Sequence, residues 1–278
     1  MNFNESKSFY TTRPLEDIFE LDILHIKLVK TLISKYIGFT PMTRDELKTA
    51  VQLYNDDEKE ALKKYGHISN WNVQNITDMS CMFSDCENFN QPLNNWDVSN
   101  VTNMEYMFYG CYDFNQPLNN WDVSNVTNMN YMFEFCYNFN QPLNKWDVSN
   151  VTEMALMFFD CEIFNQNINN WNVSNVTDME EMFFNCNKFN QPLDNWNVSN
   201  ISNMSKMFCR CINFNKPLNN WDVSNVTDMK DMFGCCYKFN QPLNNWDVSN
   251  VTNMGNMFFN CEMKNPFIFT NGKYVFSL

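Results

Sequence analysis

The stretch Trp96–Asn120, WDVSNVTNMEYMFYGCYDFNQPLNN, recurs with small changes through most of this 278-residue chain. All eight tryptophans are spaced by 25 residues, without an insertion or deletion: Trp71, Trp96, Trp121, Trp146, Trp171, Trp196, Trp221 and Trp246. An uninterrupted period of this length is typical of stacked repeats, because one unit is too small to bury its own apolar face. The sequence therefore predicts a repeat solenoid of eight coils over residues 71–261.

The residue pattern inside one repeat predicts the conformation of a coil. Alternating apolar residues in 93–98 predict a short parallel β-strand with Trp96 and Val98 on its buried face. The three-to-four spacing of apolar residues in 101–114 predicts a short helical or 3₁₀ turn, with Thr102 at its N-cap. A return loop with the sequence FNQPL completes the coil, because its proline interrupts regular pairing.

Two further columns of identical residues are expected to hold the coils together. Eight of the eleven cysteines are periodic and are expected to be buried structural thiols: Cys86, Cys111, Cys136, Cys161, Cys186, Cys211, Cys236 and Cys261. Asparagines at equivalent corners are expected to hydrogen-bond backbone groups: Asn75, Asn100, Asn125, Asn150, Asn175, Asn200, Asn225 and Asn250.

Both ends of the repeat array carry segments of a different kind. Residues 1–40 are strongly apolar at helical spacing and predict an N-terminal helical segment, which either docks on the array or recruits a partner. Residues 41–70 predict a two-helix cap, with Thr43 and Asn55 near the two helix starts and Gly66 as a stop. Residues 262–278 predict a C-terminal β-hairpin cap around Asn271-Gly272.

The charge and the cysteine pattern exclude several classes of function. The formal net charge is −13, and most of the acidic excess lies in the repeats, which disfavours nucleic-acid binding. No apolar run is long enough for a membrane span, and the N-terminus has no signal-peptide order. The three irregular cysteines, Cys81, Cys209 and Cys235, form no C-x-x-C pair, so no metal site is expected. Their redox state is left open.

No residue pattern points to catalysis or to a cofactor. The acidic row along the array is regular and has asparagine at some positions, as expected for a solvated face: Asp97, Asp122, Asp147, Asp222 and Asp247, with Asn72, Asn172 and Asn197. Calcium is a minor alternative ligand for this row, although no Asp-rich, Gly-containing loop is present. Phosphate-binding and nucleophile-elbow motifs are absent from the sequence. We therefore expect a non-enzymatic protein with no cofactor and no resident metal.

The repeat W-D-V-S-N-V-T-N-M-x-x-M-F-x-x-C-x-x-F-N-Q-P-L-N-x resembles the 25-residue repeat of the BspA-like leucine-rich-repeat surface proteins, including the mycoplasma lipoprotein subgroup. This resemblance covers residues 71–261 and implies a leucine-rich-repeat-like solenoid with a role in surface attachment or protein–protein interaction. Members also occur in large DNA viruses of protists. Since no signal peptide or lipid-attachment cysteine is seen, the viral members are the better comparison.

The positions that vary between repeats are the candidate partner-binding surface. Aromatic residues are frequent there, and exposed rings on a rigid support are typical anchors of protein interfaces. The candidates are Tyr106, Tyr109, Tyr112, Tyr131, Tyr137, Phe159, Phe184, Tyr237 and Phe259. The alternative is that these rings pack only against neighbouring coils.

The sequence supports three functional hypotheses. The first is a non-enzymatic interaction scaffold, favoured as a monomer, that binds an unidentified protein partner through the array. The second is a structural component of a virion or surface layer. The third is an F-box-like adaptor in which residues 15–37 recruit a partner. The expected location is the cytoplasm, including that of an infected host cell, or the virion.

Overall fold

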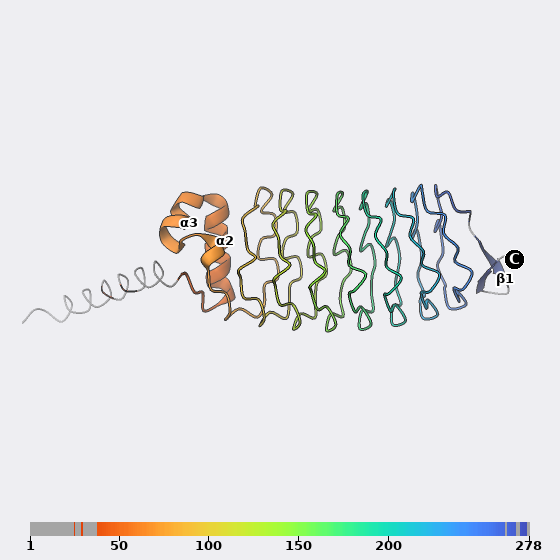
Figure 1. The fold of residues 1–278 in the computed structure, drawn as a ribbon, viewed down its shortest axis with the longest axis horizontal. Coiled ribbons are helices and arrows are strands. Elements are labelled where there is room, and N and C mark those ends of the chain that lie inside the picture. Colours follow the sequence, from red (N-terminus) through yellow and green to blue (C-terminus); the bar gives the residue numbers. More distant parts are fainter. Residues whose placement is uncertain (1–24, 26–28, 30–37, 265, 271–272, 277–278) are drawn as a thin grey trace, which may run out of the picture.

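The computed structural model describes residues 25, 29, 38–264, 266–270 and 273–276. The repeats form a row of coils stacked along the long axis of the molecule, with two helices at one end and a β-hairpin at the other (Figure 1). The predicted helical segment within residues 1–40 lies almost wholly outside the described residues, so it stays a prediction.

Two amphipathic helices cover the first coil. Helix α2 spans Arg44–Asp56 and helix α3 spans Glu58–Tyr65, followed by a 3₁₀ turn at Ile68–Asn70. Thr43 caps α2, as predicted, because its hydroxyl accepts a hydrogen bond from the Glu46 amide at 3.2 Å. The cap of α3 is Asp57 and not Asn55, which belongs to the last turn of α2.

The secondary structure predicted for the coils is wrong. In residues 71–264, which the structure describes in full, no parallel β-strand and no helix is formed. Within residues 71–264, the β-type pairing between neighbouring coils consists of isolated parallel bridges, with one residue from each coil, from Asp78 to Asn253. The described strands are β1, Phe267–Thr270, and β2, Lys273–Phe276, which pair antiparallel with each other. The repeats therefore do not have the leucine-rich-repeat-like architecture of short parallel strands and helical turns.

Left-handed backbone conformations explain why the predicted helical turn is absent. Each coil has two residues with φ between 52° and 68°, for example Tyr106 and Gly110. Each of these residues is the third residue of a four-residue turn, such as Met104–Met107, which is closed by a 3.1 Å backbone hydrogen bond. A positive φ at this position is typical of a type II turn and cannot continue a right-handed helix.

Because of these turns, the backbone N–H of every second residue points along the stack toward the next coil. In the second coil the four donors are Met104, Tyr106, Phe108 and Gly110, and their acceptors are the carbonyls of Asn128, Asn130, Met132 and Glu134, at 2.9–3.0 Å. Thr102 contributes in the opposite direction, because its amide and its hydroxyl both donate to the Thr77 carbonyl of the preceding coil. Thr102 therefore links two coils and does not cap a helix.

Ladders of identical side chains fill the core. From Trp121 to Trp221, neighbouring indole rings stack with centroids 6.3–6.5 Å apart and interplanar angles of 3° or less. A phenylalanine ladder from Phe83 to Phe258 has centroid spacings of 5.2–5.7 Å. Such stacking adds about 0.5–1.5 kcal/mol per pair to the effect of burial.

The polar atoms of these ladders bind backbone carbonyls of the preceding coil. The Trp121 indole N–H donates to the Leu93 carbonyl at 2.9 Å, and the Cys111 thiol lies 3.1 Å from the Phe83 carbonyl. The side-chain amide of Asn125 donates to the Ser99 carbonyl at 2.8 Å. The predicted hydrogen bonding of the corner asparagines is thereby confirmed. The periodic cysteines are buried as predicted, except that Cys261 in the last coil is only half-buried.

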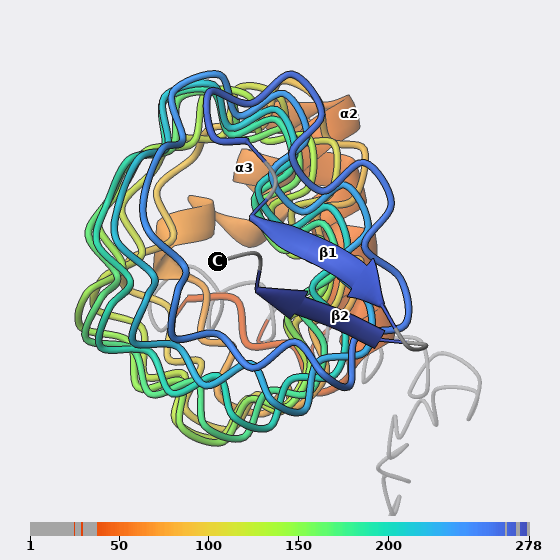
Figure 2. The same ribbon diagram turned by 90° about the vertical axis from the view of Figure 1, so that its right-hand side faces the viewer.

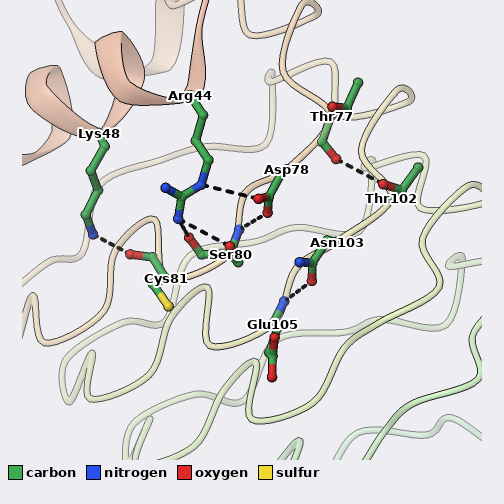
Figure 3. A network of polar contacts seen from close by, with 9 residues as sticks. All are labelled: Arg44, Lys48, Thr77, Asp78, Ser80, Cys81, Thr102, Asn103 and Glu105. Atoms are coloured by element: carbon green, nitrogen blue, oxygen red, sulfur yellow. Dashed lines mark hydrogen bonds and ion pairs between the residues drawn. The ribbon is translucent and has the colours of Figure 1, made fainter.

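Helix α2 satisfies carbonyl groups at the open side of the first coil (Figure 3). In the second coil, the carbonyls of Glu105 and Met107, which correspond to those of Ser80 and Met82, accept amides from the preceding coil; the first coil has no such neighbour. Arg44 donates to the Ser80 carbonyl, and its Nε lies 3.5 Å from the Asp78 carboxylate. Lys48 donates to the carbonyls of Cys81 and, at 3.1 Å, Met82.

The hairpin lies over the opposite end of the stack (Figure 2). Phe267 of β1 is buried and lies 6.5 Å from the Phe258 ring of the last coil, measured between centroids. Thr270 and Lys273 are paired in the register of the hairpin, and the predicted turn residues Asn271 and Gly272 lie outside the described part of the chain.

The contact between α2 and the first coil predicts a large effect of one lysine. Lys48→Met leaves two part-buried carbonyls without their cationic donor, which should lower the free energy of unfolding by about 1–3 kcal/mol. Lys63→Met, whose side chain is 79% exposed, is the matched control and should change it by less than about 0.5 kcal/mol. Urea unfolding followed by tryptophan fluorescence compares the two, and equal midpoints would exclude the proposed role of Lys48.

The left-handed positions make a second prediction, which uses two glycines. Gly110 has φ 68°, and an added Cβ would lie 3.0 Å from the Asp85 carboxylate, so Gly110→Ala should destabilise by about 1 kcal/mol. Gly255 is not left-handed, and an added Cβ would have 3.6 Å to its nearest atom, so Gly255→Ala should be neutral or slightly stabilising. Thermal unfolding of both variants measures the difference in their stability. A melting temperature of Gly110→Ala that equals or exceeds that of Gly255→Ala would contradict the prediction.

Candidate functional site

The variable residue after each Met-Phe pair forms a column along the outside of the stack. Its members are Ser84, Tyr109, Glu134, Phe159, Phe184, Cys209, Gly234 and Phe259. The backbone ladder fixes this column, because the adjacent amides bind carbonyls of the next coil, as the Gly110 amide binds the Glu134 carbonyl at 2.9 Å. Side chains from successive coils are therefore held side by side on a rigid support.

The aromatic side chains of the second to fifth coils join into one continuous cluster. We call this cluster the aromatic face; it consists of Tyr106, Tyr109, Tyr112, Tyr131, Phe135, Tyr137, Phe159 and Phe184. Its rings are partly exposed, and Tyr112 is the most exposed of them at 37%.

Ring contacts connect the whole face. Tyr106 and Tyr131 stack with centroids 4.2 Å apart, and Phe159 and Phe184 stack at 4.6 Å. Phe135 joins the two halves, because it meets Tyr109 edge-on at 5.5 Å and Phe159 edge-on at 5.4 Å. The rings are thus both packed against neighbouring coils and open to solvent on one side.

The predicted partner-binding residues belong to this face with two exceptions. Tyr237 and Phe259 are 56% and 58% exposed and take part in no ring contact among the described residues. Phe135 also belongs to the aromatic face but was not among the residues predicted from the sequence. It is the only aromatic residue at its repeat position, where the other coils have Asp85, Gly110, Asp160, Asn185, Arg210, Cys235 and Asn260.

A glutamate lies largely buried within the aromatic face, with its carboxylate oxygens still in contact with solvent. Glu134 is only 7% exposed, and in the described part of the chain its side chain forms no hydrogen bond and no ion pair. Loss of solvation, with the nearby charges of Glu181 and Asp160, raises the pKa of Glu134 to about 7. Glu134 was also missed, although it is the only charged residue in its column.

Two cations lie at the far end of the face, in the sixth coil. The Lys206 ammonium is 2.5 Å from the Glu181 carboxylate, and the Arg210 guanidinium lies over the Phe184 ring at 5.7 Å from its centroid. Loss of solvation raises the pKa of Asp160, while a hydrogen bond from Asn185 and the charge of Arg210 oppose this rise. This end of the face therefore pairs its carboxylates and rings with cations of the same chain.

The periodic cysteines and Cys209 lie in surroundings that disfavour the reactive thiolate form. Burial raises the pKa of the periodic thiols, such as Cys136, which disfavours the thiolate. Among the irregular cysteines, Cys209 is half-buried, and loss of solvation raises its pKa to about 11. Cys81, Cys209 and Cys235 are all free thiols.

The acidic row stabilises turns. The Asp97 carboxylate accepts hydrogen bonds from the amide and the hydroxyl of Ser99, at 3.1 and 2.6 Å. The same arrangement with Ser224 lowers the pKa of Asp222. Among the described residues, no three His, Cys, Asp or Glu side chains lie close enough together to hold a metal ion.

The family of the chain follows from its repeats. The profile of the family described as "Mycoplasma protein of unknown function, DUF285" matches residues 54–169, 118–201 and 154–270. These overlapping matches together cover more than half of the chain, so the protein belongs to this repeat family. Comparison with curated proteins and with solved structures gave no match. In the part of the chain that the structure describes, no helix is long and apolar enough to cross a membrane.

The buried carboxylate makes the stability of the fold depend on pH. Native Glu134 keeps its proton up to about pH 7, whereas the unfolded chain loses it near pH 4.5. Between these values the native state binds more protons, so this residue lowers stability as the pH rises from 4.5 to 7, by less than about 3 kcal/mol because solvent screens the partly accessible carboxylate.

Replacing the carboxyl group should remove this dependence. Glu134→Gln should match the wild type near pH 4 and be clearly more stable than it at pH 8, in urea unfolding at both pH values. Glu162→Gln, which removes an exposed carboxylate nearby, serves as the control. The same stability difference between Glu134→Gln and the wild type at both pH values would contradict the assignment.

Proposed function

We propose that this protein is a non-enzymatic scaffold that binds a protein partner through the aromatic face. The observation that carries the proposal is the continuous ring cluster on repeat positions that the core does not constrain. Aromatic rings supply most of the binding energy at many protein interfaces, and rings held in place lose little conformational entropy on binding. The resemblance of the repeat to BspA-like proteins also favours a role in recognition.

The aromatic face contrasts with the rest of the surface. The corner asparagines and the acidic row are identical or nearly identical in every coil and are occupied by hydrogen bonds within the stack. The aromatic face, in contrast, has a different residue set in each coil and so defines one place along the stack. A single partner can be positioned there, whereas a uniform face would offer eight equivalent places. The location in the cytoplasm or in a virion stays a proposal from the sequence.

Two phenylalanines at the same repeat position test the proposal. Phe159 belongs to the aromatic face and Phe259 does not, and serine is already accommodated at this position in the first coil, as Ser84. Phe159→Ser should reduce partner capture from the native cell by about tenfold or more, as expected for loss of an anchor ring, and Phe259→Ser should not. Affinity purification with quantitative mass spectrometry measures both.

The other functional hypotheses give different outcomes in the same experiment. A structural component would co-purify in bulk with particle proteins, and neither serine variant would change its recovery. An adaptor that recruits through residues 15–37 would lose its partner when residues 1–40 are deleted and keep it in Phe159→Ser. Either result would refute binding through the aromatic face.

A further inference from the structure

We propose that the aromatic face accepts a cationic side chain of the partner, an arginine above all, beside the carboxylate of Glu134. This inference rests on the proposed function and names the chemistry that the partner must present. Three observations carry it: a largely buried glutamate with no counter-ion among the described residues, its position among the rings, and two cations that already occupy equivalent surroundings in the same chain.

The first observation is the isolation of Glu134. Carboxylates are seldom buried without a partner, because the loss of hydration is costly. Glu134 is 7% exposed and has no hydrogen-bonding or cationic partner for its side chain among the described residues. At the same column position the other coils have neutral side chains, so the stack itself does not need an acid there.

The second observation is the placement of the carboxylate among aromatic and acidic groups. Burial is the main cause of the raised pKa values of Tyr106, Tyr109 and Glu134; the charge of Glu134 adds to the first two, and Glu181 and then Asp160 add to that of Glu134. In its column it lies between Tyr109 and Phe159, which Phe135 connects by edge contacts. Ring faces and a carboxylate together favour a cation that is flat and weakly hydrated, as the guanidinium group is.

The third observation comes from the neighbouring coils. Arg210 lies over Phe184, and Lys206 forms an ion pair with Glu181. The same face therefore already binds an arginine on a phenylalanine ring and a lysine on a glutamate. The surroundings of Glu134, with Phe135 and Phe159, combine the same groups, but the third and fourth coils place no Lys or Arg at the positions that Lys206 and Arg210 occupy in the sixth.

The negative net charge of the chain favours a positively charged ligand. A chain with a formal charge of −13 attracts a basic partner at long range, and the acidic residues of the face extend this attraction to short range. A second acidic place exists at the junction of α3 and the first coil, where Glu58, Asp85 and Glu87 line a groove of about 400 Å³. The experiment must therefore report where the ligand binds.

The test uses the full-length chain and the tripeptide Ac-Gly-Arg-Gly-NH2 as the probe, followed by NMR of protein labelled at Glu, Phe and Tyr. We expect the probe to shift the Glu134 carboxyl and Phe135 ring signals and to lower the pKa of Glu134. Glu134→Gln should weaken binding by about tenfold, because a charge-assisted hydrogen bond is lost. The same peptide with citrulline in place of arginine, which is neutral and nearly isosteric, should not bind.

Controls separate this inference from simpler effects. Glu162→Gln removes the same charge from an exposed site nearby and should leave binding unchanged. Equal binding to Glu134→Gln and the wild type would overturn the proposal, as would binding mapped to the Glu58 groove. Stronger binding of free choline than of the arginine peptide would overturn the assignment to a protein side chain.

Failure of this inference and failure of the proposed function are distinguishable. If partner capture is lost in Phe159→Ser but retained in Glu134→Gln, the aromatic face binds a protein without using a cation at Glu134. If capture is unaffected by Phe159→Ser, the proposed function itself fails, whatever the tripeptide does. Circular dichroism of Glu134→Gln checks that the fold is intact, which we expect since the substitution removes a buried charge.

Discussion

Backbone hydrogen bonding between coils is the interaction on which the whole structure depends. Up to four amides of each coil donate to carbonyls of the next coil, and they come from alternate residues of one segment. This alternation requires two left-handed residues per coil, and fifteen of these sixteen positions are occupied by residues other than glycine. Since each such residue costs on the order of 1 kcal/mol or more, the conformation persists only because hydrogen bonds and packing on both sides enforce it.

The interior of the stack shows how a narrow core accommodates polar atoms. Each indole N–H and each thiol in the middle coils points to a carbonyl of the preceding coil, so the large apolar rings can stack without leaving a buried donor unpaired. The same residues thus provide apolar contact and directional bonding. This double role explains why the repeat tolerates almost no variation at Trp and Cys, while the outer positions change freely.

The sequence predicted the position of every coil but not the path of the chain within it. The period of 25 residues locates the tryptophans, the cysteines and the corner asparagines, and these do form ladders. The spacing of Met104, Met107 and Cys111 fits a helix and a series of tight turns equally well, because both structures bring every third or fourth residue inward. What decides between them is the sign of φ at Tyr106 and its equivalents, and those positions lack the glycines that would have indicated it. The aromatic face was predictable from its variable rings, and the period places Glu134 in the same column, but its burial without a cationic partner is visible only in the structure.

The direction of the ladder gives the molecule a donor end and an acceptor end. Arg44 and Lys48 cover acceptors of the first coil, and the interfaces between inner coils repeat three or four bonds of the same kind. The number of coils is therefore independent of how α2 joins the first one, so duplication or loss of a 25-residue unit in the gene changes only the length. Such an event between α2 and the aromatic face would shift the face by one coil spacing while preserving its internal contacts, so the distance between α2 and the face can change only in fixed steps.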